Sequence, residues 1–216
     1  LRMRSAVNAV AGSVCGSGMA EREFSTLGYE RKHNPALQVK DREAFIEKKV
    51  SEEHYQPPYF RQMEDYNQNG APPMNMLPNP KPCNHEEFSN FIANGGAVLD
   101  IRSPEAFSGA YIPNTLAMPA GMIPAYAGWF LEYGKEVALV VSHCNEVDEA
   151  VRHLIRIGHD QVAGYLDGGL HTWETSGSKY DSIPSLYAGD LKKRLDDNRD
   201  FTLLDVRQKE EFESGH

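Results

Sequence analysis

The sequence contains only three cysteines among its 216 residues, Cys15, Cys83 and Cys144. Their odd number and wide spacing exclude a disulfide framework and are typical of cytosolic thiols, so we expect a cytoplasmic protein. No apolar run approaches the ~20 residues that a membrane-spanning helix needs, and no membrane contact is expected. Acidic residues outnumber basic ones, with a formal net charge of −9. An acidic surface repels phosphate backbones, which excludes nucleic acid as an expected partner.

A metal-binding pattern is also missing. The eight histidines are scattered without ligand-like spacing, and the sequence contains no His-x-His-x-Asp-His motif. Catalytic and structural metal sites draw on clusters of such side chains. We therefore expect no metal and no other cofactor in this chain.

Residues 1–80 show little regular alternation and are rich in glycine, asparagine, proline and charge. A short amphipathic helix is predicted from Lys40, with Ala44, Phe45 and Val50 on one face. Residues 67–82 contain five prolines and are interpreted as a linker. We interpret 1–80 as the tail of a domain plus a linker, and Leu1 as a truncation point.

Residues 81–180 have a different pattern. Asn84 and Glu87 can form a capping box at the start of a helix that Gly95 and Gly96 end. Buried strands are predicted at 97–101, 135–142 and 161–166, and helices at 147–157 and 170–176. Strands that alternate with helices of this length predict an α/β domain with a parallel sheet and right-handed crossovers.

An internal repeat links residues 98–107 to residues 203–212. The offset pairs Asp100 with Asp205 and Arg102 with Arg207. The second copy would therefore occupy 181–216 and be cut off after roughly its first strand.

These residues resemble the rhodanese signature, in which a strand ends in Asp-x-Arg and leads to a Glu-Phe pair. Residues 211–216 are similar to the family's usual continuation, and 165–173 to its closing strand, Gly-Gly turn and Trp-bearing helix. The resemblance implies a rhodanese-like parallel sheet flanked by helices and followed by a truncated second repeat. It also implies a scaffold role for Asp100, Arg102, Asp205 and Arg207.

The resemblance further implies a reactive cysteine at the end of the central strand, on a loop that usually carries glycine and arginine. Backbone N–H groups and the helix dipole would stabilise its thiolate there. Counting back from Gly158 puts this position at Val141 or Ser142, so Cys144 comes two or three residues late. We therefore expect that this domain has no catalytic residue. If it does have one, Cys144 is the candidate. We interpret the surrounding residues as a vestigial active-site loop: Ser142, His143, Asn145, Glu146 and Val147.

Three acids surround that candidate, namely Glu146, Asp148 and Glu149. Like charge disfavours a thiolate and repels anionic sulfur donors. The same acids begin a predicted helix, where they stabilise its dipole, which is a sufficient structural reason for them.

Residues 11–75 resemble the tail of metallo-β-lactamase-fold thiol enzymes, which carry a Glu-Arg-x-x-Asn-Pro stretch like Glu30–Pro35 here. Persulfide dioxygenases and hydroxyacylglutathione hydrolases are examples. An arrangement in which this fold is fused to two rhodanese-like domains resembles that of bacterial sulfide-oxidation enzymes. The resemblance implies mononuclear iron and a small thiol or persulfide substrate in the parent protein.

The same resemblance implies that Arg31 and Lys32 hold the carboxylate of a glutathione-like substrate, although they could be a solvated basic pair. Ala9 departs from the pattern, because a histidine is expected there.

Three hypotheses stay open. The chain could be part of a persulfide-metabolising fusion with a non-catalytic rhodanese-like unit. It could instead be an interaction module that scaffolds a homo-oligomer or positions a partner. It could also be an active sulfurtransferase that uses Cys144.

Overall fold

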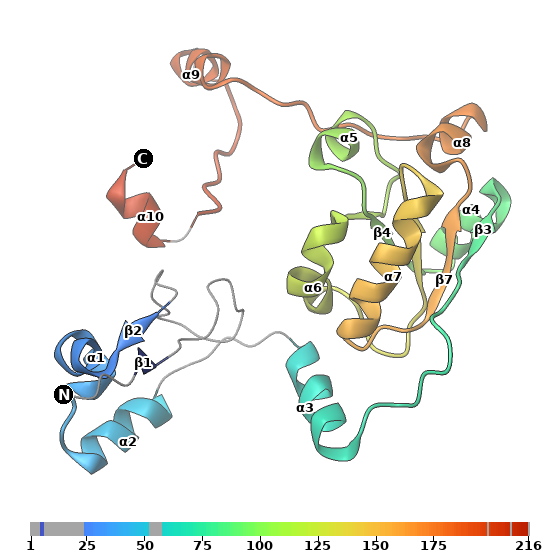
Figure 1. Cartoon of the computed structure of the whole chain (residues 1–216). Coiled ribbons are helices and arrows are strands. Elements are labelled where there is room, and N and C mark those ends of the chain that lie inside the picture. Colours follow the sequence, from blue (N-terminus) through green and yellow to red (C-terminus); the bar gives the residue numbers. More distant parts are fainter. Residues whose placement is uncertain (1–4, 7–23, 52–57, 198, 208, 216) are drawn as a thin grey trace.

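The centre of the molecule is a five-stranded sheet, seen in a computed structural model that describes residues 5–6, 24–51, 58–197, 199–207 and 209–215. All four strand pairs are parallel, in the order β3-β7-β6-β4-β5. The strands, labelled in part in Figure 1, are β3 Lys81–Cys83, β4 Ala97–Asp100, β5 Leu116–Ala117, β6 Val137–Val140 and β7 Val162–Leu166. The predicted α/β architecture with a parallel sheet is therefore confirmed.

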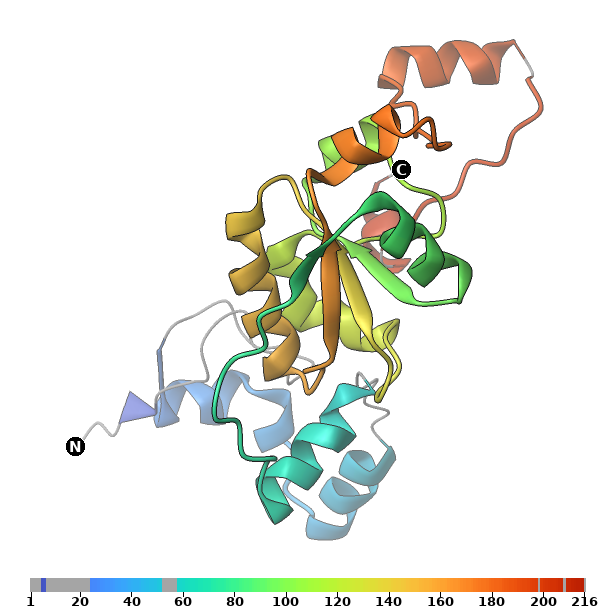
Figure 2. The ribbon, with the colours of Figure 1, turned by 90° about the vertical axis from the view of Figure 1, so that its right-hand side faces the viewer.

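Helices cover both faces of this sheet, as the two views show (Figures 1 and 2). One face carries α4 His85–Ala93 and α8 Gly169–Thr175, whose Phe88 and Trp173 pack with Val98 and Val140. The other face carries α6 Ile123–Tyr126 and α7 Val147–Arg156, packed on residues such as Leu139. Successive strand residues face opposite layers because side chains alternate along a strand. The two apolar layers give the sheet its continuous hydrophobic strands.

The helix boundaries follow the predicted capping chemistry. Asn84 Oδ1 accepts a hydrogen bond from the Glu87 N–H at 3.0 Å, and a Glu87 carboxylate oxygen accepts from the Asn84 N–H at 2.9 Å. This reciprocal pair satisfies two N–H groups that the first turn of α4 leaves without helical partners. Helix α5, Pro104–Gly109, begins similarly after Ser103, whose hydroxyl accepts from the Ala106 N–H.

The sequence predicts no helix between Val50 and Asn84, and it interprets residues 67–82 as a linker, yet α3 spans Tyr59–Asn69. Tyr59 is buried in the core beside α6 and α7, and Phe60 and Met63 pack against the same cluster. This apolar contact with the sheet domain stabilises a helix whose own sequence, rich in asparagine and glutamine, gives only a weak signal. The extended segment 70–80 then leads from α3 back to β3.

The N-terminal part contains β1 Ser5–Ala6, β2 Ser25–Thr26, α1 Leu27–His33 and α2 Arg42–Ser51. The helix predicted from Lys40 is present as α2, but it buries none of its residues. Much of the stretch that resembles metallo-β-lactamase-fold enzymes, including Ala9 and Cys15, lies outside the described residues. In the part of the chain that is described, no helix is both long and apolar enough to cross a membrane.

The second repeat is only half formed. Helices α9 Ala188–Asp196 and α10 Lys209–Ser214 are present, but the first strand that the repeat predicts for this copy is not found among the described residues. Leu204 is 76% exposed, whereas Leu99, its counterpart in the first repeat, is fully buried. Leu99 is paired with β5 and β6, and no described strand offers such a pairing to Leu204. A central strand needs neighbours to satisfy its backbone groups, so the sequence pattern alone cannot form one.

Burial of His159 predicts a pH-dependent stability. Its ring stacks on Tyr133 with centroids 4.4 Å apart, and its Nε2 has no hydrogen-bond partner among the described residues. Burial lowers the pKa of His159, while the carboxylate of Asp160 opposes that shift. An unfolded histidine takes up a proton near pH 6.5 (about the model-peptide value) but the buried one resists it, so stability falls as the pH drops below about 6.5.

We expect His159→Leu to flatten this pH dependence. The measurement is the thermal unfolding midpoint compared at about pH 7.5 and about pH 5.5. His171→Gln, a change of an exposed histidine on α8, is the control and should keep the wild-type difference. Equal acid sensitivity of wild type and His159→Leu would contradict this assignment.

Candidate functional site

The predicted loop lies at the carboxyl end of the central strand β6. Val141 follows β6 and is buried, Ser142 turns outward, and Cys144–Glu146 form a short 3-10 turn that runs into α7. In open parallel sheets, ligands bind outside the carboxyl ends of the strands. The six predicted loop residues therefore come together at the edge where chemistry on this fold is expected: Ser142, His143, Cys144, Asn145, Glu146 and Val147.

The thiol of Cys144 is exposed at this edge. Among the described residues, none donates a hydrogen bond to its Sγ. A reactive thiolate depends on nearby N–H donors or cations for its stability. Cys144 therefore lies on the loop where a reactive cysteine is expected, but no described residue donates a hydrogen bond that would stabilise its thiolate.

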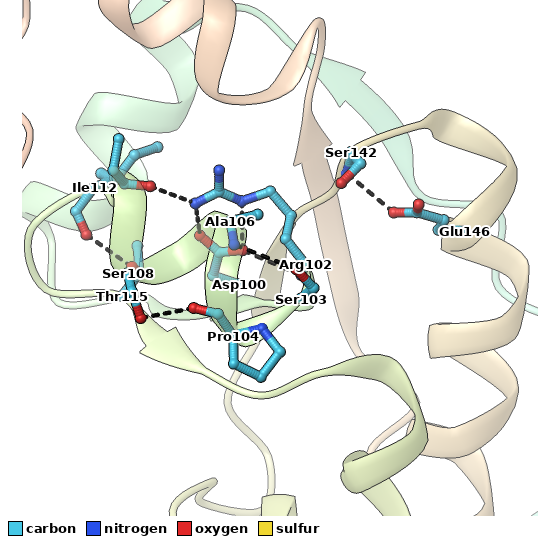
Figure 3. A network of polar contacts seen from close by, with 11 residues as sticks. Asp100, Arg102, Ser103, Pro104, Ala106, Ser108, Ile112, Thr115, Ser142 and Glu146 are labelled. Atoms are coloured by element: carbon cyan, nitrogen blue, oxygen red, sulfur yellow. Dashed lines mark hydrogen bonds and ion pairs between the residues drawn. The ribbon is translucent and has the colours of Figure 1, made fainter. Parts of the chain in front are cut away.

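Three amides of the loop, those of Ser142, Glu146 and Val147, are occupied by the loop's own oxygen atoms. The Ser142 N–H donates to a carboxylate oxygen of Glu146 at 2.9 Å, a contact visible in Figure 3. The Glu146 N–H donates to the His143 carbonyl at 3.0 Å, and the Val147 N–H donates to the Cys144 carbonyl. The negative charge that this turn holds is therefore the carboxylate of Glu146. The sequence predicts that Glu146 stabilises the helix dipole and disfavours a thiolate on Cys144. It does not predict the hydrogen bond between Glu146 and the Ser142 N–H.

The other two acids pair along the helix. Asp148 accepts from Arg152 Nε at 2.8 Å, and Glu149 lies 3.6 Å from His153 Nε2. Both pairs are one helical turn apart, which is the spacing at which side chains meet on a helix surface. The first turn of α7 thus combines acids that favour the helix dipole with the Arg152 cation, which partly neutralises Asp148.

The neighbouring strand β7 contributes a tyrosine to this edge. Burial raises the pKa of Tyr165, and negative charge on Cys144, Asp167 and Cys83 adds to the effect. The phenol therefore lies within electrostatic range of the Cys144 thiol. Tyr165 begins the stretch 165–173 that resembles the family's closing strand, but that resemblance implies no role for it at the site, so it is not among the predicted site residues.

The turn after β7 is built from two glycines with positive φ. Gly169 has φ of +56°, and a Cβ placed there would lie 2.5 Å from the Val141 carbonyl oxygen. Only glycine combines that backbone conformation with so close an approach. The contact fixes the end of β7 against the first residue of the Cys144 loop.

A buried ion pair supports the same edge from β4. Arg102 Nε donates to Asp100 Oδ1 at 2.8 Å, and Arg102 Nη2 donates to Asp100 Oδ2 at 2.6 Å (Figure 3). Arg102 Nη2 also donates to the Ala110 carbonyl at 2.8 Å. The bidentate pair joins the end of β4 to the end of α5, because Asp100 closes the strand and Ala110 follows the helix. The Arg102 guanidinium therefore binds a carboxylate and a backbone carbonyl of the same domain, which is the geometry expected for a structural role.

The second repeat reproduces this corner. Arg207 makes the same forked contact with Asp205 and donates from Nη1 to the Gly215 carbonyl at 3.1 Å. Gly215 and Ala110 are both eight residues after their arginine. The corner therefore forms locally even where the strand before it does not, and it lies apart from the Cys144 loop.

Arg31 and Lys32 occupy the last turn of α1, and both are exposed. The adjacent Glu30 accepts from the Ser25 hydroxyl and from Asn34 Nδ2, the latter at 2.9 Å. Figure 1 shows α1 well separated from α7, so the structure does not bring these cations to the Cys144 loop. Basic residues at a helix C-terminus also favour the dipole, so their position is compatible with a structural role.

The described residues contain no group of three or more histidine, cysteine, aspartate or glutamate side chains arranged to hold a metal ion. A mononuclear iron site draws its ligands from such a group. The part of the chain that the structure describes therefore does not fit the iron centre implied for the parent protein.

Residues 84–176 match the family model for the Rhodanese-like domain. The match runs from α4 to α8 and covers less than half of the chain, and these residues form a rhodanese-like domain. No curated protein matches the sequence.

Solved structures extend the comparison. A metallo-beta-lactamase from Staphylococcus aureus subsp. aureus COL is 29% identical with a TM-score of 0.54, and the alignment covers 68% of this chain but 41% of that protein. The aligned part of this chain is therefore longer than the rhodanese-like domain alone. The Rhodanese_3 like domain of the Alr3790 protein from Anabaena sp. is 22% identical with a TM-score of 0.40, covering 43% of this chain and 98% of that one. Thiosulfate sulfurtransferase from Pseudomonas aeruginosa is 16% identical with a TM-score of 0.42, covering 74% of this chain and 35% of that one.

Proposed function

We propose that this chain belongs to a metallo-β-lactamase–rhodanese fusion that metabolises persulfides, and that its rhodanese-like domain does not itself transfer sulfur. The family match at 84–176 and the similarity to the metallo-beta-lactamase from Staphylococcus aureus support the two parts of the fusion. The chain spans less than half of that relative's length, so the activity of a whole protein is part of the proposal.

The hydrogen bond between the Ser142 N–H and Glu146 is the observation that carries the proposal. A rhodanese-type loop works by directing several N–H groups at a sulfur anion, which the helix dipole also stabilises. Here one such amide is taken by a carboxylate of the same loop, and two more are taken by its carbonyl groups. A second anion on Cys144 would add a negative charge close to that of Glu146, and like charge disfavours a thiolate or a persulfide anion there.

A support role follows for the domain within the fusion. The buried Asp100–Arg102 pair and the two apolar layers give a rigid sheet that can hold neighbouring domains in place. We propose that Arg31 and Lys32 contact the carboxylate of a small glutathione-like thiol in the whole protein, that any iron is bound by other residues of that protein, and that the setting is cytoplasmic.

One observation favours a second candidate function, an active sulfurtransferase. Cys144 is exposed, and it lies at the carboxyl end of the central strand, on the turn that leads into α7. That is close to where the rhodanese resemblance places a reactive cysteine. The two candidates differ in whether turnover depends on the Cys144 thiol.

We expect no cysteine-dependent sulfur transfer from thiosulfate to cyanide. The experiment measures thiocyanate formation by the wild type, by Cys144→Ser and by Cys83→Ser. Cys83 is half-buried on β3, and burial, followed by the charge of Glu87, raises its pKa, so it serves as a matched thiol control. All three proteins should give the rate of the uncatalysed reaction. A wild-type rate well above that background, lost in Cys144→Ser and kept in Cys83→Ser, would establish the second candidate.

A further inference from the structure

A cleft lies at the end of α7 opposite to the Cys144 loop. It has a volume of about 350 Å³ and is bounded by α3, by the segment that follows α3 and by the C-terminal turn of α7. Met63, Met74 and Ile155 give it an apolar lining. A cavity of this size is within the range used to bind small organic molecules.

The cleft exists because α3 packs close to the turn after α7. Gly158 has φ of +83°, and a Cβ there would lie 3.1 Å from Met63 Cε and 3.1 Å from Tyr133 Cε1. Glycine therefore permits both the backbone turn and the approach of the helix. Tyr59 and Phe60 anchor the other end of α3 in the core, so the wall that Met63 provides is held in place.

One residue that lines this cleft is a cation with no ion pair among the described residues. Arg156 lines the cleft in the last turn of α7, and its side chain forms no ion pair with any described residue. Arg152, one turn earlier on the same helix, is paired with Asp148 at 2.8 Å. Tyr66 and Asn67 add a hydroxyl and an amide to the lining. The apolar space is therefore lined by polar groups from both α3 and α7, and the cation among them is available to an anion.

We propose that this cleft binds a small monocarboxylate with an apolar body, its carboxylate on Arg156 and its body against the two methionines and Ile155. A guanidinium recognises a carboxylate through two parallel hydrogen bonds, and methionine side chains adapt to apolar groups of different shape. Asp160 also lines the cleft, and its charge disfavours a ligand with a second carboxylate. The site is separate from the sulfur-transfer edge, because α7 extends for ten residues between the two.

The alternative is that Arg156 only stabilises the dipole of α7 and that the cleft binds nothing. Arg152 is the matched control, since both arginines lie exposed on α7 and differ in their ion pairing and in their place relative to the cleft. A ligand pair that differs only in charge provides a second control on the unmodified protein.

The experiment is a titration of the full chain with 3-phenylpropionate and with its neutral amide, followed by amide chemical shifts. We expect saturable binding of the acid with shifts centred on Met63 and Arg156, and binding of the amide weaker by about tenfold, because hydrogen bonds to charged groups are the stronger ones. Arg156→Gln should weaken acid binding by about tenfold or more, while Arg152→Gln stays within about twofold of wild type.

Three results would overturn the proposal: no saturable binding of the acid, equal binding of acid and amide, or equal binding by wild type and Arg156→Gln. The comparison of acid with amide needs no mutation, so it decides the matter even if a variant is poorly folded. Neither arginine belongs to the Cys144 loop, so the outcome is independent of the sulfur-transfer assay.

Discussion

Asp100→Ala is expected to destabilise the rhodanese-like domain by about 3–5 kcal/mol, the range for breaking a buried ion pair from one side. The side chains of Asp100 and Arg102 are 0% and 6% exposed, so removal of the carboxylate leaves a guanidinium buried without its counter-charge. Arg102 would keep only its bond to the Ala110 carbonyl. The measurement is the free energy of unfolding from urea denaturation.

Asp205→Ala is the matched control, because the second repeat contains the same pair in an exposed setting. The side chains of Arg207 and Asp205 are 43% and 30% exposed, so water can solvate whichever partner remains. We expect this variant to unfold at nearly the same urea concentration as the wild type. Equal and large losses in the two variants would show that burial is not the source of the effect.

Gly169→Ala is expected to cost roughly 3 kcal/mol, which combines a left-handed backbone penalty with steric overlap. The added Cβ would lie 2.5 Å from the Val141 carbonyl oxygen, and neither group can move without shifting the end of β7 or the start of the Cys144 loop. The loss would appear in the same urea experiment.

Gly177→Ala separates the two contributions. Gly177 also has positive φ, at +79°, but nothing lies within 4 Å of a Cβ placed there. Its replacement should therefore cost only the backbone penalty, about 1–2 kcal/mol. If Gly169→Ala were no more harmful than Gly177→Ala, the close packing between the Gly-Gly turn and Val141 would not be a constraint on the fold.

The parallel sheet could be predicted because local signals and burial agree in residues 84–176. The capping box at Asn84 and Glu87 is present as expected, and the apolar runs around Leu99 and Leu139 became buried strands. The repeated Asp-x-Arg corner was equally predictable, since it depends on residues close in sequence.

Contacts that are distant in sequence explain what could not be predicted. Helix α3 depends on Tyr59, which packs into a core made by residues far along the chain. The first strand expected for the second repeat has the right residues but no neighbouring strand among the described residues. An apolar pattern shows which side chains of a segment can be buried. Whether they are buried depends on contacts with segments that are distant in the sequence.

The internal bonding of the Cys144 loop could not be predicted from the sequence. Counting back from Gly158 places the expected cysteine position at Val141 or Ser142, in the segment that follows β6, and that role stays a prediction. The bond from the Ser142 N–H to Glu146 depends on how the turn closes, and acids at a helix start have several uses. Tyr165 was missed for a similar reason, since its approach to Cys144 crosses from one strand to another.

The most direct measurement is the mass of the protein after exposure to a persulfide donor, with the modified residue located by peptide mapping. A Glu146 carboxylate bonded inside the Cys144 loop predicts that Cys144 remains a free thiol, with no additional sulfur atom retained after the donor is removed. A stable persulfide on Cys144, formed stoichiometrically and lost in Cys144→Ser, would contradict this account.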